Sequence, residues 1–208
     1  ASILVVMSMA IDAAPNDPAA LEVMMQLAKR YEEIGLFTRA EEKYAKVALL
    51  HTVDAAGRAR SSDSMLVSEA FFGSARCLVR TGDFVRADRI LRGLTRNLSS
   101  GPLFNEAVYL WATLAVAQDQ RAEAMRRLNM MELARCPKDI RTRAQLERLL
   151  LEVADKGRDP ASVVAFVDSV KILPQEDLNA YARRAYVVCF DRLARARDIN
   201  GMQQFIDQ

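Results

Sequence analysis

The stretch LAKRYEEIGLFTRAEEKYAKVALL, residues 27–50, contains two helical patterns separated by a single glycine, Gly35. Apolar side chains on both sides of the glycine recur every three or four residues, which is the period of an α-helix with one apolar face. They are Leu21, Met24, Leu27, Ala28 and Tyr31 before it, and Ala40, Tyr44, Val47 and Ala48 after it. Because glycine can adopt the left-handed backbone conformation that ends a helix, we expect an antiparallel helix pair that turns at Gly35.

The same pattern recurs in three further segments, which begin near Phe71, Val108 and Leu146. The four predicted breaks are Gly35, Gly82, Asp119 and Gly157, with separations of 47, 37 and 38 residues. Such a period is typical of helical repeat proteins, in which each pair buries its apolar face against the next pair. The sequence therefore predicts an all-α fold, an α-solenoid of stacked antiparallel helix pairs.

The residue types at these positions resemble the tetratricopeptide repeat (TPR) family. The match is carried by Leu27, Ala28, Tyr31, Gly35, Ala40 and Tyr44, then by Gly82 with Ala87, and by Gly157 with Phe166 and Pro174. The resemblance implies a right-handed superhelix. The repeats are degenerate: they exceed the usual period of about 34 residues, Asp119 replaces a glycine, and Ser162 replaces an alanine. Other helical hairpin repeats therefore stay open as an alternative.

We interpret residues 1–208 as a single TPR-like domain and expect it to be part of a longer solenoid. The predicted repeat boundaries are about 1–17, 18–60, 61–101, 102–139, 140–175 and 176–208. Residues 9–18 resemble the end of an earlier repeat, and the last range predicts a long helix, a break at Asn200 and Gly201, and a short helix.

The extra length of the first interval lies at residues 51–65. This segment predicts a loop or extended helix ends, with Ser61, Ser62 and Asp63 as candidate N-caps. A regulatory or partner-docking insertion is the alternative.

Composition places few limits on the cellular setting. The chain is 51% hydrophobic and 27% charged with a net charge of +2, which is typical of a folded domain and gives no overall field that would attract nucleic acid or membrane. The apolar start, residues 1–11, lacks a basic leader and is too short to span a bilayer. Three widely spaced cysteines favour a reducing, cytoplasmic compartment. Because the chain begins without Met, we expect a trimmed N-terminus, so periplasmic or secreted locations stay open.

The sequence contains no pattern typical of a catalytic, metal or cofactor site. His51 is the only histidine, so a triad or a His-based metal site lacks partners. Cys136 precedes a predicted turn and is expected to be a small buried side chain. Trp111 lies in an apolar helical stripe and is expected in the core. We therefore predict a protein that is not an enzyme and needs no cofactor.

Stacked helix hairpins form an extended concave surface, and the resemblance implies that a protein or peptide partner binds there. The positions that the resemblance places on that surface are Met25, Lys29, Phe72, Arg76, Tyr109, Thr113 and Leu151. The alternative for each is a contact with the neighbouring repeat. The main hypothesis is a non-catalytic scaffold or adaptor within a larger assembly, with self-association also open.

Two other functions compete with this hypothesis. Arginines crowd the second repeat between Arg76 and Arg96 and the last long helix between Arg183 and Arg197, which would suit RNA binding. An ion-paired surface is the simpler explanation of these clusters. An accessory domain of an enzyme is the third hypothesis.

Overall fold

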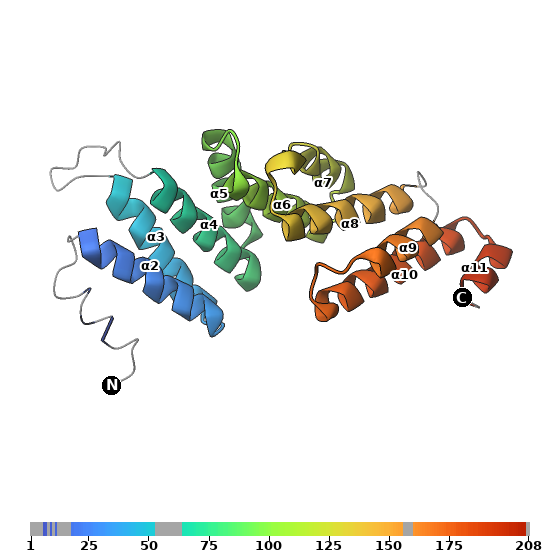
Figure 1. The fold of residues 1–208 in the computed structure, drawn as a ribbon, viewed down its shortest axis with the longest axis horizontal. Helices are drawn as coiled ribbons and strands as arrows, with labels where there is room; N and C mark the ends of the chain where they lie inside the picture. Colours follow the sequence, from blue (N-terminus) through green and yellow to red (C-terminus); the bar gives the residue numbers. More distant parts are fainter. Residues whose placement is uncertain are drawn as a thin grey trace. The chain divides into compact units, whose positions relative to one another are not determined.

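The computed structural model describes residues 6, 7, 9, 11, 18–52, 64–155 and 160–206. The described residues form ten α-helices and one short 3-10 helix, and within each of the two units described below successive helices pack as neighbours (Figure 1). The predicted all-α fold of helix pairs is therefore confirmed. The chain divides into two compact units, residues 1–114 (unit 1) and 115–208 (unit 2), and each is described by itself.

Unit 1 contains two helix pairs and most of a fifth helix. The helices are α2 (Pro18–Glu33), α3 (Phe37–Thr52), α4 (Ser64–Thr81), α5 (Phe84–Asn97) and α6 (Pro102–Ala117). One core cluster lies among α2, α3 and α4 around Leu27, Tyr44 and Cys77. A second lies among α4, α5 and α6 around Leu91 and Trp111, which confirms Trp111 as a core residue.

Unit 2 begins at the end of α6. It contains α7 (Arg121–Leu128), the 3-10 helix η1 (Leu133–Arg135), α8 (Lys138–Ala154), α9 (Pro160–Ser169), α10 (Gln175–Arg195) and α11 (Ile199–Ile206). An apolar cluster joins α8, α9 and α10 around Leu146, Val167 and Tyr181.

The predicted breaks at Gly35, Gly82 and Asp119 are all confirmed, and they share one geometry. Their φ angles are +79°, +83° and +54°. In each turn, the residue after the one with positive φ donates its N–H to the carbonyl five positions before it. The Leu36 N–H, for example, donates to the Tyr31 carbonyl at 2.8 Å. This is the Schellman arrangement, which satisfies the last carbonyls of a helix.

A fourth turn of this kind corrects the predicted end of the last long helix. Arg197 has φ +54°, and the N–H of Asp198 donates to the Leu193 carbonyl at 3.1 Å. Asn200 and Gly201, where the break was predicted, lie inside α11. The N–H of Gly201 donates to the Asp198 carboxylate at 2.8 Å, so Asp198 stabilises the start of α11 and the dipeptide continues the helix.

Small residues set how closely the helices of a pair approach. Ala40, Ala87 and Ala124 each follow a turn by five positions, and all three are fully buried. Gly73 does the same between α3 and α4, because a Cβ there would lie 2.6 Å from two carbons of the Tyr44 ring. The chain therefore uses small residues at the points of closest packing.

Several predictions fall on residues that the structure does not describe. They concern the break at Gly157, the N-caps at Ser61 to Asp63 and most of residues 9–18, and they stay predictions, as do the single domain and its repeat boundaries. Among the described helices, none has the length and apolarity needed to cross a bilayer.

Candidate partner-binding groove

A groove of about 680 Å³ lies where α2, α3 and α4 end or begin at their turns. Side chains from the end of α2, the start of α3, the last turns of α4 and one position of α6 line it. They are Glu32, Glu33, Ile34, Gly35, Phe37, Arg76, Val79, Arg80 and Leu110. Because Gly35 ends α2 in a left-handed turn, Ile34 stays 58% exposed at the groove edge while Phe37 starts the next helix.

The floor of the groove holds a paired carboxylate, that of Glu32. Arg76 donates to it from Nε and Nη2, each at 2.8 Å, and the buried Tyr44 hydroxyl donates to it at 2.8 Å. The Arg76 guanidinium also lies 5.0 Å from the centroid of the Phe72 ring. This bidentate geometry fixes the groove wall, because charge-assisted bonds are shorter and stronger than neutral ones.

This network also shifts the pKa values of its members. Burial, followed by the hydrogen bond to Glu32, raises the pKa of Tyr44. Burial alone would lower the pKa of Arg76, but its bonds to Glu32 raise it overall. Tyr44 therefore stays a neutral donor and Arg76 a cation throughout the physiological range.

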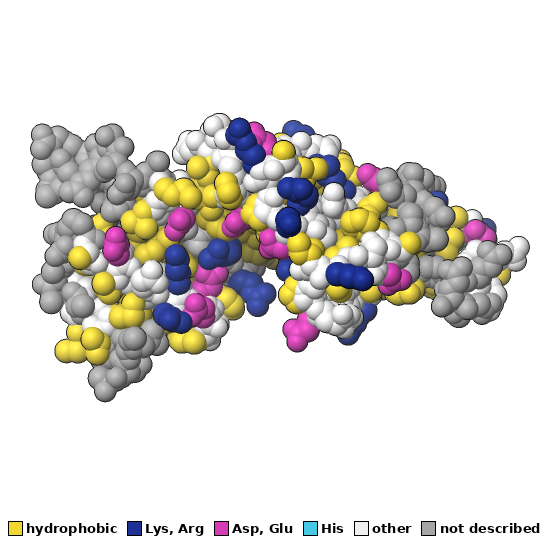
Figure 2. All heavy atoms as spheres, viewed as in Figure 1, with side chains coloured by type: hydrophobic (Ala, Val, Ile, Leu, Met, Phe, Trp, Pro, Cys, Tyr) yellow, Lys and Arg dark blue, Asp and Glu magenta, His cyan; other side chains and the backbone are white. Residues whose placement is uncertain are grey.

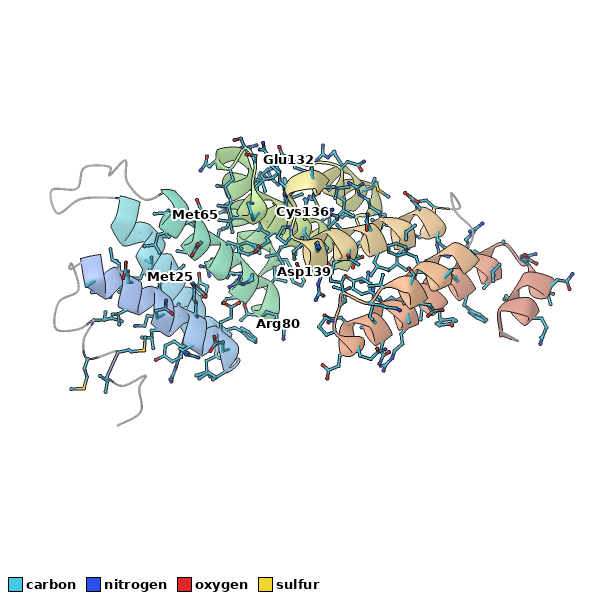
Figure 3. All side chains as sticks on the ribbon, viewed as in Figure 1. Met25, Met65, Arg80, Glu132, Cys136 and Asp139 are labelled. Atoms are coloured by element: carbon cyan, nitrogen blue, oxygen red, sulfur yellow. The ribbon has the colours of Figure 1, made fainter. Side chains whose placement is uncertain are left out.

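Arg80 gives the groove a surplus of positive charge. The two groove carboxylates are already paired, Glu32 with Arg76 and Glu33 with Arg30 at 2.7 Å. Arg80 is exposed at the C-terminal end of α4 (Figure 3), where its guanidinium lies 5.2 Å from the centroid of the Phe37 ring. Phe37, Val79 and Leu110 give the same groove an apolar surface.

Three of the seven predicted surface residues are buried, which corrects their predicted exposure. Met25 is 2% exposed, Phe72 is 6% exposed and Leu151 is 5% exposed. Met25 lies in the core cluster with Leu27 and Tyr44, and Phe72 lies in the cluster with Leu91. Met25 and Phe72 therefore pack against neighbouring helices, which was the stated alternative for these positions.

The other four predicted residues are accessible, but only Arg76 lines the groove. Lys29 Nζ lies 3.8 Å from a Glu69 carboxylate oxygen. Tyr109 and Thr113 are half-buried on α6, and the Thr113 hydroxyl donates to the Leu110 carbonyl at 2.9 Å.

Ile34, Phe37 and Arg80 line the groove but were not predicted as site residues. All three lie within two positions of Gly35 or Gly82. The predicted helix breaks could therefore have located them, since loops and helix ends often carry binding residues.

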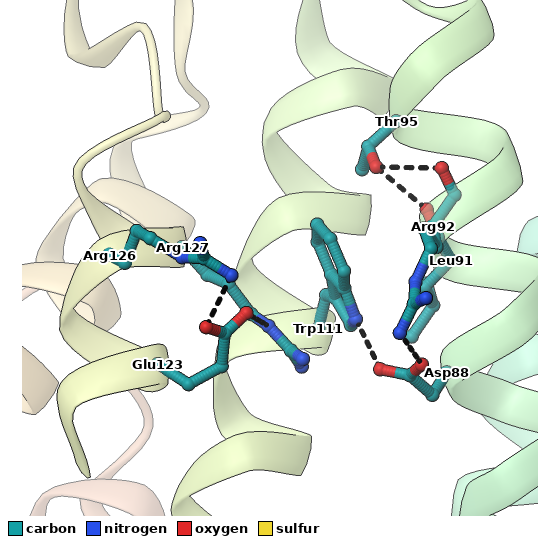
Figure 4. Close-up of polar contacts among 8 residues, drawn as sticks. All are labelled: Asp88, Leu91, Arg92, Thr95, Trp111, Glu123, Arg126 and Arg127. Carbon is teal, nitrogen blue, oxygen red and sulfur yellow. Dashed lines mark hydrogen bonds and ion pairs between the residues drawn. The ribbon is translucent and has the colours of Figure 1, made fainter. Parts of the chain in front are cut away.

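Three of the six arginines between Arg76 and Arg96 form ion pairs: Arg76, Arg86 and Arg92. Arg86 lies 2.7 Å from Glu41, and Arg92 lies 2.7 Å from Asp88. Asp88 also accepts a bond of 2.7 Å from the Trp111 indole (Figure 4). Figure 2 shows basic and acidic side chains interspersed over the described residues of the face in view. This arrangement favours the ion-paired explanation over an RNA-binding stripe.

Several arginines of unit 2 are also ion-paired. Arg184 clamps Glu147, and Arg195 lies 2.5 Å from Asp191. Figure 4 shows Glu123 between Arg126 and Arg127. Hydrogen bonds from Arg126, and then from Arg127, lower the pKa of Glu123. The carboxylate therefore stays ionised.

The described residues offer no group of three His, Cys, Asp or Glu side chains that could hold a metal ion. All three cysteines are free and buried. Burial, followed by the charge of Glu32, raises the pKa of the Cys77 thiol to about 12. A thiol with this pKa is a poor nucleophile at neutral pH.

No family model and no curated protein matches the sequence. Among solved structures, YrrB, described as a TPR protein with an unusual peptide-binding site, superimposes with a TM-score of 0.61 at 14% identity, covering 97% of this chain and 89% of that chain. This chain has the tetratricopeptide repeat fold. BtubC from P. vanneervenii has a TM-score of 0.64 at 13% identity over 98% of this chain and 84% of its own. TPR-like repeats of a Podosopora anserina putative kinesin light chain have a TM-score of 0.58 at 18% identity over 92% of this chain and 93% of theirs.

Proposed function

We propose that this protein is a non-catalytic binding scaffold, and that unit 1 holds a peptide segment of its partner in the groove at the α2 and α4 turns. The observation that carries the proposal is the exposed Arg80 cation above an apolar surface, next to carboxylates that are already neutralised by Arg76 and Arg30. The TPR fold supports it in general terms, because helical repeats present extended binding surfaces.

The chemistry of the groove selects one kind of peptide. An Asp or Glu of the partner would pair with Arg80, and an adjacent apolar side chain would cover Phe37, Val79 and Leu110. A basic peptide would gain less there, because Glu32 and Glu33 already have arginine partners. An acidic residue beside a large apolar residue is therefore the expected recognition element.

A selection from a phage-displayed library of random peptides tests the proposal without a known partner. The wild-type protein is expected to enrich peptides that combine acidic and large apolar residues, and Arg80→Glu is expected to weaken the winning peptide at least about tenfold. Arg89→Glu, which reverses another exposed arginine on α5, is the matched control and should bind like wild type.

Two results would overturn the proposal. One is a selection that enriches no shared motif over an unrelated helical protein. The other is a winning peptide whose affinity falls equally in Arg80→Glu and Arg89→Glu, because general charge attraction would then explain the binding.

A further inference from the structure

One face of α10 exposes three large apolar side chains. Val187 is 67% exposed, and Tyr186 and Phe190 are each 46% exposed. The opposite face of the same helix carries the buried Tyr181, Ala185 and Cys189, which pack in the core of unit 2. An exposed apolar stripe at helical spacing is typical of a helix that packs against another helix in an assembly.

The charges and small residues beside this stripe are arranged symmetrically about Val187. Arg183 and Asp191 lie four positions before and after it, and Ala180 and Ala194 lie seven positions before and after it. All four are exposed and, at 100° per residue, all lie within about 40° of Val187 on the helix. A second copy of α10 running antiparallel would therefore meet Arg183 with Asp191, and Ala180 with Ala194.

We propose that the protein forms a homodimer in which α10 packs antiparallel against α10 of a second copy, with Val187 on the twofold axis. A twofold interface requires a self-complementary surface, and the Arg183–Asp191 pairing provides it twice. The alanines allow the helices to approach closely at both ends of the contact, while Val187 and Phe190 supply its apolar centre.

Charge complementarity selects a second copy over an unrelated partner. Arg183 is exposed and has no ion pair among the described residues, whereas Asp191 is held only by the exposed Arg195 of its own helix. In the antiparallel arrangement each Asp191 gains a second cation and each Arg183 gains an anion. A parallel arrangement would place like charges opposite each other.

Charge exchange tests the interface in the chain of residues 1–208. Sedimentation velocity of wild type over a concentration series is expected to show a monomer–dimer equilibrium. Arg183→Glu and Asp191→Arg are each expected to raise the dimer dissociation constant about tenfold, and the double variant is expected to restore it. A wild-type protein that stays monomeric, or a double variant weaker than both single ones, would overturn the proposal.

A cysteine on the proposed axis gives a second, independent test. Val187→Cys should form a disulfide-linked dimer on mild oxidation, because the twofold places position 187 opposite its own copy. Val85→Cys, which is 72% exposed on α5, is the control and should not cross-link selectively. The native cysteines are buried, so the background is low. Equal cross-linking of the two variants would contradict the antiparallel α10 contact, and circular dichroism verifies that both are folded.

Discussion

In both units, a glutamate on the first helix of one pair binds an arginine on the first helix of the next pair. In unit 1, Arg76 of α4 binds Glu32 of α2 at 2.8 Å through both contacts, and in unit 2, Arg184 of α10 binds Glu147 of α8 at 2.5 and 2.8 Å. Each arginine also lies over an aromatic ring of its own helix, Phe72 or Tyr181. The same bidentate Glu–Arg ion pair, called a clamp below, therefore joins successive helix pairs in both units.

The two clamps differ in their access to solvent and in the number of their donors. The side chain of Glu32 is 21% exposed at the floor of the groove, and Tyr44 supplies a further donor to it. The side chain of Glu147 is 3% exposed. The buried Glu147 pair contributes to stability, whereas the Glu32 pair contributes to stability and also shapes a groove that solvent reaches.

The largest expected difference between the clamps comes from removing each arginine. Arg184→Ala leaves the buried Glu147 carboxylate without its cation and is expected to lower the free energy of unfolding by about 3 kcal/mol. Arg76→Ala should cost less, about 1.5 kcal/mol, because Glu32 keeps the Tyr44 hydroxyl and reaches solvent. Urea unfolding followed by circular dichroism measures both.

Arg195→Ala, which breaks an exposed pair with Asp191, is the control for this comparison and should cost less than about 0.5 kcal/mol. If Arg76→Ala were as destabilising as Arg184→Ala, the argument from solvent access would be wrong.

Gly73→Ala is expected to have the next largest effect and to act through unit 1 alone. The new methyl group would meet the Tyr44 ring, which is fully buried and is anchored to Glu32 by its hydroxyl. Overpacking of this kind costs about 2 kcal/mol. The fluorescence of Trp111, the only tryptophan, reports unfolding of this unit.

Gly93 provides the matched glycine in the interior of α5, where a Cβ meets nothing within 4 Å. Gly93→Ala should therefore stabilise the protein by about 0.5–1 kcal/mol. Equal destabilisation by the two alanines would show that the close approach of Tyr44 to Gly73 has no energetic role.

Tyr44→Phe tests the additional donor that distinguishes the Glu32 clamp from the Glu147 clamp. The change removes the third donor to Glu32 but keeps the ring in its place between α3 and α4. The expected loss is about 1 kcal/mol, the ordinary contribution of a buried hydrogen bond, and Trp111 fluorescence during urea unfolding measures it. Ser74→Ala, which removes a bond of 3.1 Å to Glu41, should cost no more than this.

Unit 1 is also expected to lose stability at alkaline pH. The pKa of Cys77 is raised to about 12, and that of Tyr44 is raised as well, so the folded state disfavours both deprotonated forms. The stability due to these shifts is complete below the unfolded pKa values, about 8.5 and 10. It is lost as pH rises above them, because the unfolded chain then releases protons that the folded chain keeps.

Urea midpoints measured by Trp111 fluorescence between pH 7 and pH 11 test this sign, and Tyr44→Phe should show a shallower decline above pH 10. A midpoint that rises over this range would contradict the direction of both shifts.

Features set by local rules could be predicted from the sequence. The apolar period located the helices, and Gly35, Gly82 and Asp119 located the turns. The break at Arg197 was not predicted, because an arginine rarely takes a positive φ. Asn200 and Gly201 were predicted as the break instead, because both residue types favour turns. Asn200 and Gly201 are helical because the Asp198 carboxylate accepts a hydrogen bond from the Gly201 N–H and stabilises the start of α11.

The candidate groove was harder to predict than the fold. Met25 and Phe72 occupy helix positions that the resemblance placed on the open surface, yet packing against neighbouring helices buries them. A helical period identifies an apolar stripe but does not say which polar positions remain exposed once pairs stack. The charge of Arg80 stands out in the groove because Arg76 and Arg30 pair with the nearby carboxylates. The Arg30–Glu33 pair is local, but the Arg76–Glu32 pair joins residues 44 positions apart, which spacing does not encode.

Hydrogen exchange with and without a selected acidic–apolar peptide tests directly whether the groove at the α2 and α4 turns binds the peptide. Peptide binding should slow exchange at residues 30–37 and 76–81, which form the groove, and should leave exchange in α10 unchanged at fixed oligomeric state. The same experiment on Arg80→Glu should show no slowing at these residues. Peptide-dependent protection confined to other helices, or unchanged protection in Arg80→Glu, would contradict the assignment of this groove as the binding site.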